Sequence, residues 1–202
     1  MSYKRVLLKF VIVIVGTAIA AFGLDMAIYA GFGSATLAVL WQGIAKTIHI
    51  TVGQASLVVA TVMVIFCWFY DRKQINVGTV LYQLIYSFCL DLFSPLMRYG
   101  GSKLLNFVIM VVGLVIFSFG SALYSVADFG KGSYEALTFA FVDRKKWPIS
   151  NVRVVLDVVC VMSGWLLGGT VGICTVATIL LSGILLQWFV KLLTPTAEKI
   201  LK

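Results

Sequence analysis

The chain has 202 residues, of which 61% are hydrophobic and only 12% are charged. A soluble domain carries about 25% charged residues, so this composition does not suit a water-facing surface and favours a protein whose outer wall faces lipid. The formal net charge of +8 does not indicate a nucleic-acid-binding protein, because the basic residues lie at the ends of apolar segments and not along a polar stripe. They fit a positive surface beside the anionic lipids of a bilayer.

Six apolar segments are long enough to cross a bilayer, whose hydrocarbon core of about 30 Å needs roughly 20 apolar residues per helix. The predicted spans are residues 8–30, 52–70, 75–97, 104–127, 150–168 and 171–193. The first follows Lys4 and Arg5 like a secretory signal, but its apolar run continues to Ala30, too long for a signal core. We therefore predict an uncleaved first helix and an all-α membrane protein with six transmembrane helices.

Two further segments are helical in pattern but too short to cross a membrane. Residues 35–48 lie between the first and second spans, and residues 132–143 lie between the fourth and fifth. Each is predicted to be either an interfacial helix or a half-helix that dips into the bilayer.

The chain is predicted to consist of two related halves, residues 1–97 and 98–202. A single offset of 97 positions pairs Gly16 with Gly113, Gly23 with Gly120, Phe32 with Phe129, Gly33 with Gly130 and Trp68 with Trp165. Matches of glycine and aromatic residues at one offset are rare by chance in a chain dominated by Leu, Val and Ile, so they indicate a repeat. Three spans per half is an odd number, which predicts a 3+3 inverted repeat, an arrangement found in many secondary transporters.

The distribution of basic residues predicts the orientation in the membrane. With the N-terminus in the cytoplasm, only Lys46, Arg98 and Lys103 lie outside. The inside then collects Lys4, Arg5, Lys9, Arg72, Lys73, Lys131, Arg144, Lys145, Lys146, Arg153, Lys191, Lys199 and Lys202. The positive-inside rule therefore places both termini in the cytoplasm.

Metal and cofactor chemistry is not expected. The four cysteines, Cys67, Cys89, Cys160 and Cys174, lie in apolar runs without metal-ligand spacing, and they are expected to be small buried hydrophobic residues with no disulfide framework. The single histidine, His49, lies in a polar outer turn and receives no catalytic or metal role. We expect no bound cofactor.

The turns Gly31-Phe32-Gly33-Ser34 and Asp128-Phe129-Gly130-Lys131, each leading into a short helix, resemble the bacterial YitT/YczE family of six-helix membrane proteins. The segment 150–153 with Asp157, and Gly78-Thr79 at the start of the third span, share this resemblance, which covers nearly the whole chain. It implies a protein of the bacterial inner membrane.

The chain departs from the family pattern Gly-x-Gly/Ser-Pro-x-Asp-Ala-Leu, because both prolines are missing. Glu135 stands at the place of the second acid and Ala38 at that of the first. The soluble C-terminal domain of longer members is expected to be absent. Since the function of the family is poorly defined, the resemblance implies the fold more than an activity.

Ionisable residues inside spans are costly and are therefore the first candidates for a binding site. Asp25 and Asp91 are predicted at a similar outer level, and Asp157 roughly 10 Å deep in the fifth span with Arg153 one turn before it. Glu135 in the second short helix joins this inner group. The alternatives are that Arg153 and Asp157 only neutralise each other, and that Asp25 and Asp91 reach the headgroup layer.

The openings of the short helices are the second candidate. Ser34 and Thr36 at one, and Lys131 and Ser133 at the other, offer hydroxyls, free backbone N–H groups and the positive end of a helix dipole. Such ends bind anionic groups when they dip into a membrane, whereas ordinary capping is the alternative. Lys131 favours an anionic or carboxylate-bearing ligand, and Gln42 is a candidate cavity-lining residue.

Together these features predict a small secondary transporter or permease for a small, anionic solute, working by alternating access between the inverted halves. The alternative is a non-transporting accessory, regulatory or ligand-capturing subunit that acts with other proteins. An enzyme is not expected, because the sequence has no metal cluster, nucleotide-binding loop or nucleophile–base pair. The expected partners are the lipid bilayer, a solute, and a second copy in a homodimer or accessory membrane proteins, with no nucleic acid.

Overall fold

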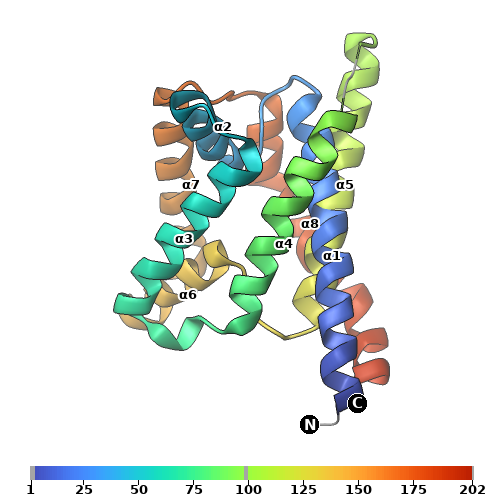
Figure 1. The fold of residues 1–202 in the computed structure, drawn as a ribbon, viewed down its shortest axis with the longest axis vertical. Helices are drawn as coiled ribbons and strands as arrows, with labels where there is room; N and C mark the ends of the chain where they lie inside the picture. Colours follow the sequence, from blue (N-terminus) through green and yellow to red (C-terminus); the bar gives the residue numbers. More distant parts are fainter. Residues whose placement is uncertain (1–2, 98–99, 202) are drawn as a thin grey trace. The chain divides into compact units, whose positions relative to one another are not determined.

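The computed structural model describes residues 3–97 and 100–201, so Arg98 and Lys202, which entered the orientation argument, lie outside the described residues. The described chain forms eight α-helices and two short 3-10 helices, and it contains no strand (Figure 1). In chain order these are α1 (Tyr3–Tyr29), α2 (Thr36–Ile48), α3 (Val52–Tyr70), η1 (Arg72–Gln74), α4 (Val77–Phe93), η2 (Ser94–Leu96), α5 (Lys103–Val126), α6 (Ser133–Lys145), α7 (Ile149–Leu166) and α8 (Ile173–Leu201).

Six of these helices confirm the predicted membrane spans. By length and apolar composition the described candidates are Arg5–Tyr29, Val52–Tyr70, Gly78–Leu96, Lys103–Val126, Ile149–Leu166 and Ile173–Ala197. Large apolar side chains on them point outward; Phe69, Leu166 and Leu104 are 84%, 77% and 74% exposed. Such a surface suits lipid and not water. The chain is therefore an all-α membrane protein.

The last helix is longer than predicted, because α8 continues past residue 193 to Leu201. Pro195 lies inside it and withholds one backbone N–H. The hydroxyl of Thr194 donates to the carbonyl of Val190, 2.7 Å away, within the same stretch. The helix therefore continues through Pro195.

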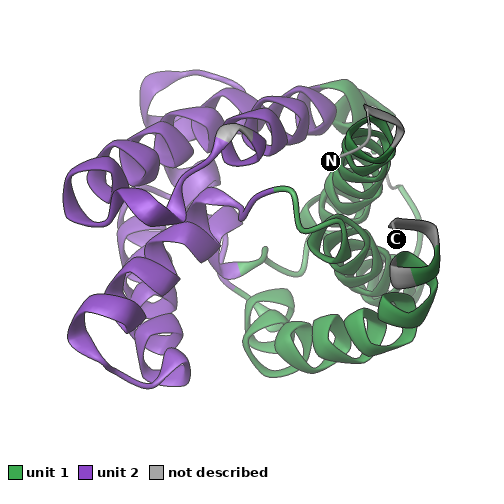
Figure 2. Cartoon of the chain, turned by 90° about the horizontal axis from the view of Figure 1, so that it is seen from below, with its two compact units in different colours: residues 1–35, 92–129, 172–202 green, residues 36–91, 130–171 purple. Residues whose placement is uncertain are grey.

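The helices form two compact units, and each unit combines segments from both halves of the sequence (Figure 2). Unit 1 comprises Met1–Ala35, Leu92–Phe129 and Gly172–Lys202, and so contains α1, α5 and α8. Unit 2 comprises Thr36–Asp91 and Gly130–Val171, and contains α2, α3, α6, α7 and α4 up to Asp91. These units differ from the predicted halves 1–97 and 98–202, whose relation as repeats stays a prediction.

In unit 1, α1 and α5 pack closely through four glycines. Gly16 faces Gly120 and Gly23 faces Gly113, so the two helices run antiparallel. A Cβ atom added at Gly23 would lie 2.6 Å from the carbonyl oxygen of Gly113, a distance that real Cβ contacts do not show. Glycines spaced by seven thus allow the backbones of α1 and α5 to touch.

The rest of unit 1 packs α8 against this helix pair. A cluster of buried residues unites the three helices and consists of Ala27, Ala30, Met110, Leu114 and Cys174. The backbone N–H of Cys174 also donates to the carbonyl of Phe32, 2.9 Å away. This bond fixes the start of α8 against the loop that follows α1.

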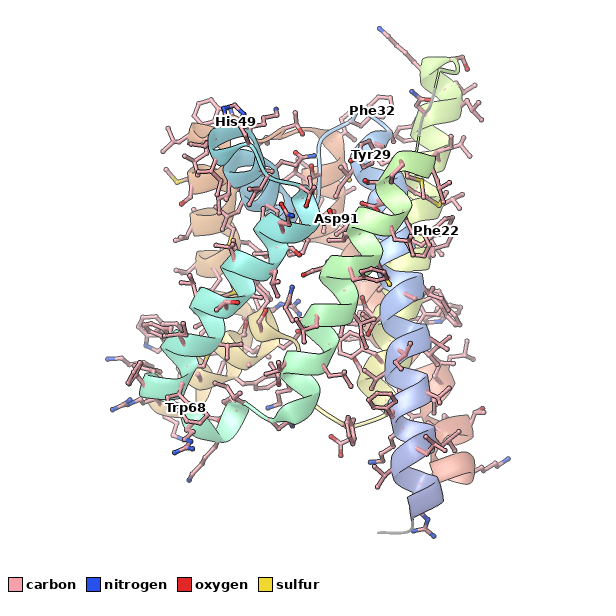
Figure 3. The ribbon with its side chains drawn as sticks, viewed as in Figure 1. Phe22, Tyr29, Phe32, His49, Trp68 and Asp91 are labelled. Carbon is pink, nitrogen blue, oxygen red and sulfur yellow. The ribbon has the colours of Figure 1, made fainter. Side chains whose placement is uncertain are left out.

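In unit 2, the short helix α2 packs lengthwise against α7. Gly43 and Gly164 make this contact, and a Cβ atom added at Gly43 would lie 2.5 Å from the carbonyl oxygen of Gly164. The other short helix, α6, packs against α3 and α7. His49, which follows α2, and Trp68, near the end of α3, lie at opposite ends of unit 2 (Figure 3).

Candidate functional site

Both short helices begin at one carboxylate in the middle of α7. The Oδ1 atom of Asp157 accepts a hydrogen bond of 2.8 Å from the hydroxyl of Thr36, the first residue of α2. It accepts a second bond, also of 2.8 Å, from the hydroxyl of Tyr134, the second residue of α6. The structure thus brings together Thr36 and Asp157, two of the predicted site residues.

From this point the short helices run toward opposite ends of α7. The last turn of α2 reaches the far end, where the Lys46 ammonium donates to the carbonyl of Gly168 at 2.6 Å. The last residue of α6, Lys145, comes shortly before Ile149, where α7 begins. Each short helix has 13 residues, about 20 Å at 1.5 Å per residue. The N-terminal ends of the two short helices therefore meet alongside α7.

Tyr134 contacts both Arg153 and Asp157. The Arg153 guanidinium carbon lies 5.8 Å from the centre of the Tyr134 ring, within the range of a cation–π contact. The Tyr134 hydroxyl is also 3.4 Å from the Arg153 carbonyl. Both charged residues are described, and the structure records no ion pair between them. Tyr134 therefore contacts both charged residues.

The positive ends of two helix dipoles and two hydroxyl donors face Asp157. Each helix N-terminus carries roughly half a positive elementary charge from its aligned peptide dipoles. Two hydroxyl donors add hydrogen bonds to the carboxylate, and bonds of this charged type are stronger than neutral ones. Asp157 is half-buried, and its Oδ2 atom has no hydrogen-bond partner among the described residues. The Oδ1 atom of Asp157 is thus held by two hydrogen bonds, while its Oδ2 atom can accept a hydrogen bond from a ligand.

A chain of buried polar side chains extends from the opening of α6 into α4 and α3. The hydroxyl of Ser133 donates to the Oε1 atom of Gln83 at 3.3 Å, and the Nε2 atom of Gln83 donates to the hydroxyl of Ser87 at 3.1 Å. The hydroxyls of Ser87 and Ser56 are 2.7 Å apart. All four residues are buried, where polar groups are costly unless they are hydrogen-bonded.

Sequence reasoning left out several of these residues. Ser56 and Ser87 were not candidates, although Gln83 and Ser87 stand four residues apart on one face of an apolar helix. That spacing was the available signal. Tyr134 carried no signal that linked it to Asp157, because the two residues belong to different helices.

Glu135 and Lys131 lie near the opening of α6 and make separate contacts. A Cβ atom added at Gly132 would lie 2.2 Å from the Oε2 atom of Glu135, so this carboxylate folds back over the N-cap residue. The Lys131 ammonium donates to the Oε1 atom of Gln74 at 2.8 Å and lies 3.9 Å from the Phe139 ring centre. The N-terminus of α6 therefore has its own acid, and Lys131 binds a neighbouring side chain.

Gln42 and Asp91 hold backbone segments in place. The Oε1 atom of Gln42 accepts hydrogen bonds from the backbone N–H and the hydroxyl of Thr170, in the loop after α7. Asp91 accepts from the hydroxyl of Thr51 at 2.6 Å and from the N–H of Gly53 at 2.9 Å, so it caps α3 (Figure 3). The structure does not bring either residue into hydrogen-bonding contact with Asp157.

Asp25 and Ser34 belong to unit 1. Asp25 is 1% exposed on α1, and Ser34 is fully buried with a hydroxyl that has no hydrogen-bond partner among the described residues. Because Asp25 and Asp91 lie in different compact units, their predicted outer pairing stays a prediction.

The cysteines are all free and buried, as predicted. Among residues 3–97 and 100–201, no group of three His, Cys, Asp or Glu side chains is arranged to hold a metal ion.

Six apolar helices, together with two short helices whose N-terminal ends meet at Asp157 of α7, define a multi-pass α-helical membrane protein. The chain belongs to the family of unknown function DUF6198, whose model matches residues 7–191. No solved structure matches the chain.

Three bacterial proteins are similar to the chain over most of its length. An uncharacterized protein of Haemophilus influenzae is 26% identical over 193 residues, which cover 95% of this chain and 86% of the relative. The uncharacterized membrane protein YczE of Bacillus subtilis is 22% identical over 186 residues, which cover 92% of this chain and 86% of the relative. The uncharacterized protein YyaS of the same organism is 25% identical over 178 residues, which cover 87% of this chain and 89% of the relative. The match to YczE confirms the resemblance to the YitT/YczE family.

Proposed function

We propose that this protein is a small secondary transporter of the bacterial inner membrane, and not an enzyme, that moves a small polar solute by alternating access. The observation that carries the proposal is the meeting of α2 and α6 at Asp157. Broken helices whose N-terminal ends converge within the membrane form the binding sites of many secondary transporters. An acidic residue inside a span is costly to keep and is a functional candidate by default.

The contact between α1 and α5 supports the inverted repeat that this mechanism uses. In the offset of 97 positions, Gly16 corresponds to Gly113 and Gly23 to Gly120. The observed contacts join Gly16 to Gly120 and Gly23 to Gly113, so exchanging the halves maps each contact onto the other. Antiparallel helices related in this way fit a two-fold axis perpendicular to them, which an inverted repeat requires.

The chemistry of the site favours a solute that presents a hydrogen-bond donor or a positive charge. The carboxylates of Asp157 and Glu135 already stand at the two helix N-termini. A bare anion would be repelled by them, whereas a donor would reach the available Oδ2 atom of Asp157. We therefore propose this solute class in place of the anionic solute that Lys131 suggested, since Lys131 is bound to Gln74.

Reconstitution tests the proposal directly. The purified protein alone would be placed in liposomes, and counterflow would be measured for solutes drawn from a growth screen of a deletion strain. Saturable, solute-dependent flux supports a transporter. An absence of flux for every solute that gives a phenotype, together with recovery when a second membrane protein is added, would favour an accessory subunit.

Orientation is tested by labelling single cysteines in a background without native cysteines. We expect a membrane-impermeant maleimide to label intact cells at positions 46 and 103 but not at 73 and 145, because the positive-inside rule keeps Lys73 and Lys145 in the cytoplasm. Permeabilised cells serve as the control and should label at all four. Labelling of position 145 in intact cells would contradict the predicted orientation and would place both termini outside the cytoplasm.

The roles of Arg153 and Asp157 are separated by exchanging their charges. We expect Arg153→Asp with Asp157→Arg to fold but to remain inactive, because the donors of Thr36 and Tyr134 are aimed at position 157 and one helical turn displaces the carboxylate by about 5.4 Å. Flux and size-exclusion profiles would be compared with those of the single variants. Restored flux in the double variant would mean that the two residues only neutralise each other.

A further inference from the structure

Basic side chains gather where the ends of α3 and α6 meet in unit 2. We call this group the basic end; its members are Arg72, Lys73, Arg144, Lys145 and Lys146, and all five are exposed. Arg144 joins the two helices, because its guanidinium donates to the carbonyl of Tyr70 at 2.6 Å. A second link is the 2.6 Å bond from Gln74 in η1 to Asp143 in α6.

The neighbouring acids do not neutralise the basic end. The carboxylate of Asp143 accepts from the side chain of Gln74 at 2.6 Å. Asp71 accepts from the same amide at 3.3 Å and from the backbone N–H of Lys73 at 3.3 Å. No ion pair involving these two acids is recorded among the described residues. Five cations against two carboxylates leave a formal surplus of three positive charges.

Both arginines lie over aromatic rings. The guanidinium carbon of Arg72 lies 3.7 Å from the centre of the Trp68 ring, and that of Arg144 lies 4.5 Å from the centre of the Tyr70 ring. A guanidinium carries five N–H donors, and a cation–π contact with a ring leaves donors that can bind a phosphate. The rings also reduce the freedom that the arginines would lose on binding.

Apolar residues beside the basic end place it at a membrane boundary. Phe69 is 84% exposed, Trp147 is 51% exposed and Trp68 is 47% exposed. Tryptophan is enriched at the level of lipid headgroups, and an exposed phenylalanine next to it suits acyl chains. A soluble anion would use the charges but not these apolar side chains.

We propose that the basic end binds the phosphate headgroups of anionic phospholipids, with Arg72 and Arg144 as the main phosphate ligands. The neighbouring Trp68, Phe69 and Trp147 contact the glycerol and the upper acyl chains. This interaction is independent of the proposed transport site, because it uses none of the residues around Asp157.

The test compares lipids by thermal unfolding of the purified full-length protein in detergent. We expect phosphatidylglycerol to raise the melting temperature by about 2–4 °C and phosphatidylcholine to raise it much less. Arg72→Gln with Lys73→Gln should lose most of this rise, since neither side chain holds another part of the chain by a hydrogen bond. The matched control is Arg5→Gln with Lys103→Gln, which removes one arginine and one lysine from exposed positions of unit 1. This control should keep the increase in melting temperature that phosphatidylglycerol causes.

Three results would overturn the proposal. Equal stabilisation by both lipids would show that charge does not matter, and equal stabilisation by inorganic phosphate would show a free anion as the ligand. A full response in the Arg72 and Lys73 variant would place the lipid elsewhere. If that variant does not fold, Arg72→Gln alone replaces it, because it still removes one of the two main phosphate ligands. Native mass spectrometry counts the retained phosphatidylglycerol in each variant.

Discussion

Asp157→Asn is expected to abolish solute flux in liposomes while the detergent-solubilised protein remains monodisperse. The amide keeps the shape of the side chain, and its carbonyl oxygen still accepts from Thr36 and Tyr134. It removes the negative charge, however, and replaces the available acceptor Oδ2 with a donor. A hydrogen bond to a charged group is worth about 1.5–3 kcal/mol, so solute affinity should fall by about tenfold to more than a hundredfold.

Two kinds of variant complete this experiment. Thr36→Val and Tyr134→Phe each remove one donor to Asp157 and should reduce flux less, because the other donor remains. Asp128→Asn is a matched control, since it neutralises an exposed carboxylate of unit 1 at a left-handed position with φ of 45°, and asparagine tolerates that conformation. Wild-type flux in Asp157→Asn would assign this carboxylate to the scaffold.

Gly23→Leu is expected to destabilise unit 1 more than any exposed substitution. Even its Cβ atom would lie 2.3 Å from the backbone nitrogen of Phe117, and a backbone atom cannot turn aside like a flexible side chain. Overpacking of this kind costs about 1–3 kcal/mol, occasionally more. The melting temperature in detergent should therefore fall by about 2–12 °C, and the yield of folded protein should fall with it.

Gly183→Leu is the matched control for this loss. It makes the same change in α8, where a Cβ atom would meet nothing within 4 Å. Leucine is also a better helix former than glycine, so the melting temperature should stay unchanged or rise slightly. A Gly23→Leu protein that melts like the Gly183→Leu protein would contradict the close contact between α1 and α5.

Hydropathy and length alone predicted the spans and the short helices. These properties are local, because a membrane requires each crossing segment to satisfy its own backbone hydrogen bonds and to expose apolar side chains over about 20 residues. The close packing at Gly16 and Gly23 was predictable for a similar reason, since a spacing of seven keeps both glycines on one face. Pro195 shows the limit of such rules, because α8 continues through it.

The site required the tertiary structure. Thr36 and Tyr134 are 121 and 23 residues from Asp157 in the chain, yet both donate to one of its oxygens. Arg153, one turn from Asp157, is the expected partner by spacing, but the hydrogen bond to Asp157 comes from Tyr134 of another helix.

The tertiary contacts also separate the candidate residues that hold backbone segments from those that meet at Asp157. Gln42 and Asp91 carry the same kinds of groups as the site residues, but they bind Thr170 and the start of α3. The sequence shows which polar side chains lie within apolar, membrane-spanning segments. Which of them hold the scaffold and which converge on one point depends on how helices distant in the chain pack, because a polar side chain in lipid binds whichever partner the packing brings within hydrogen-bonding distance.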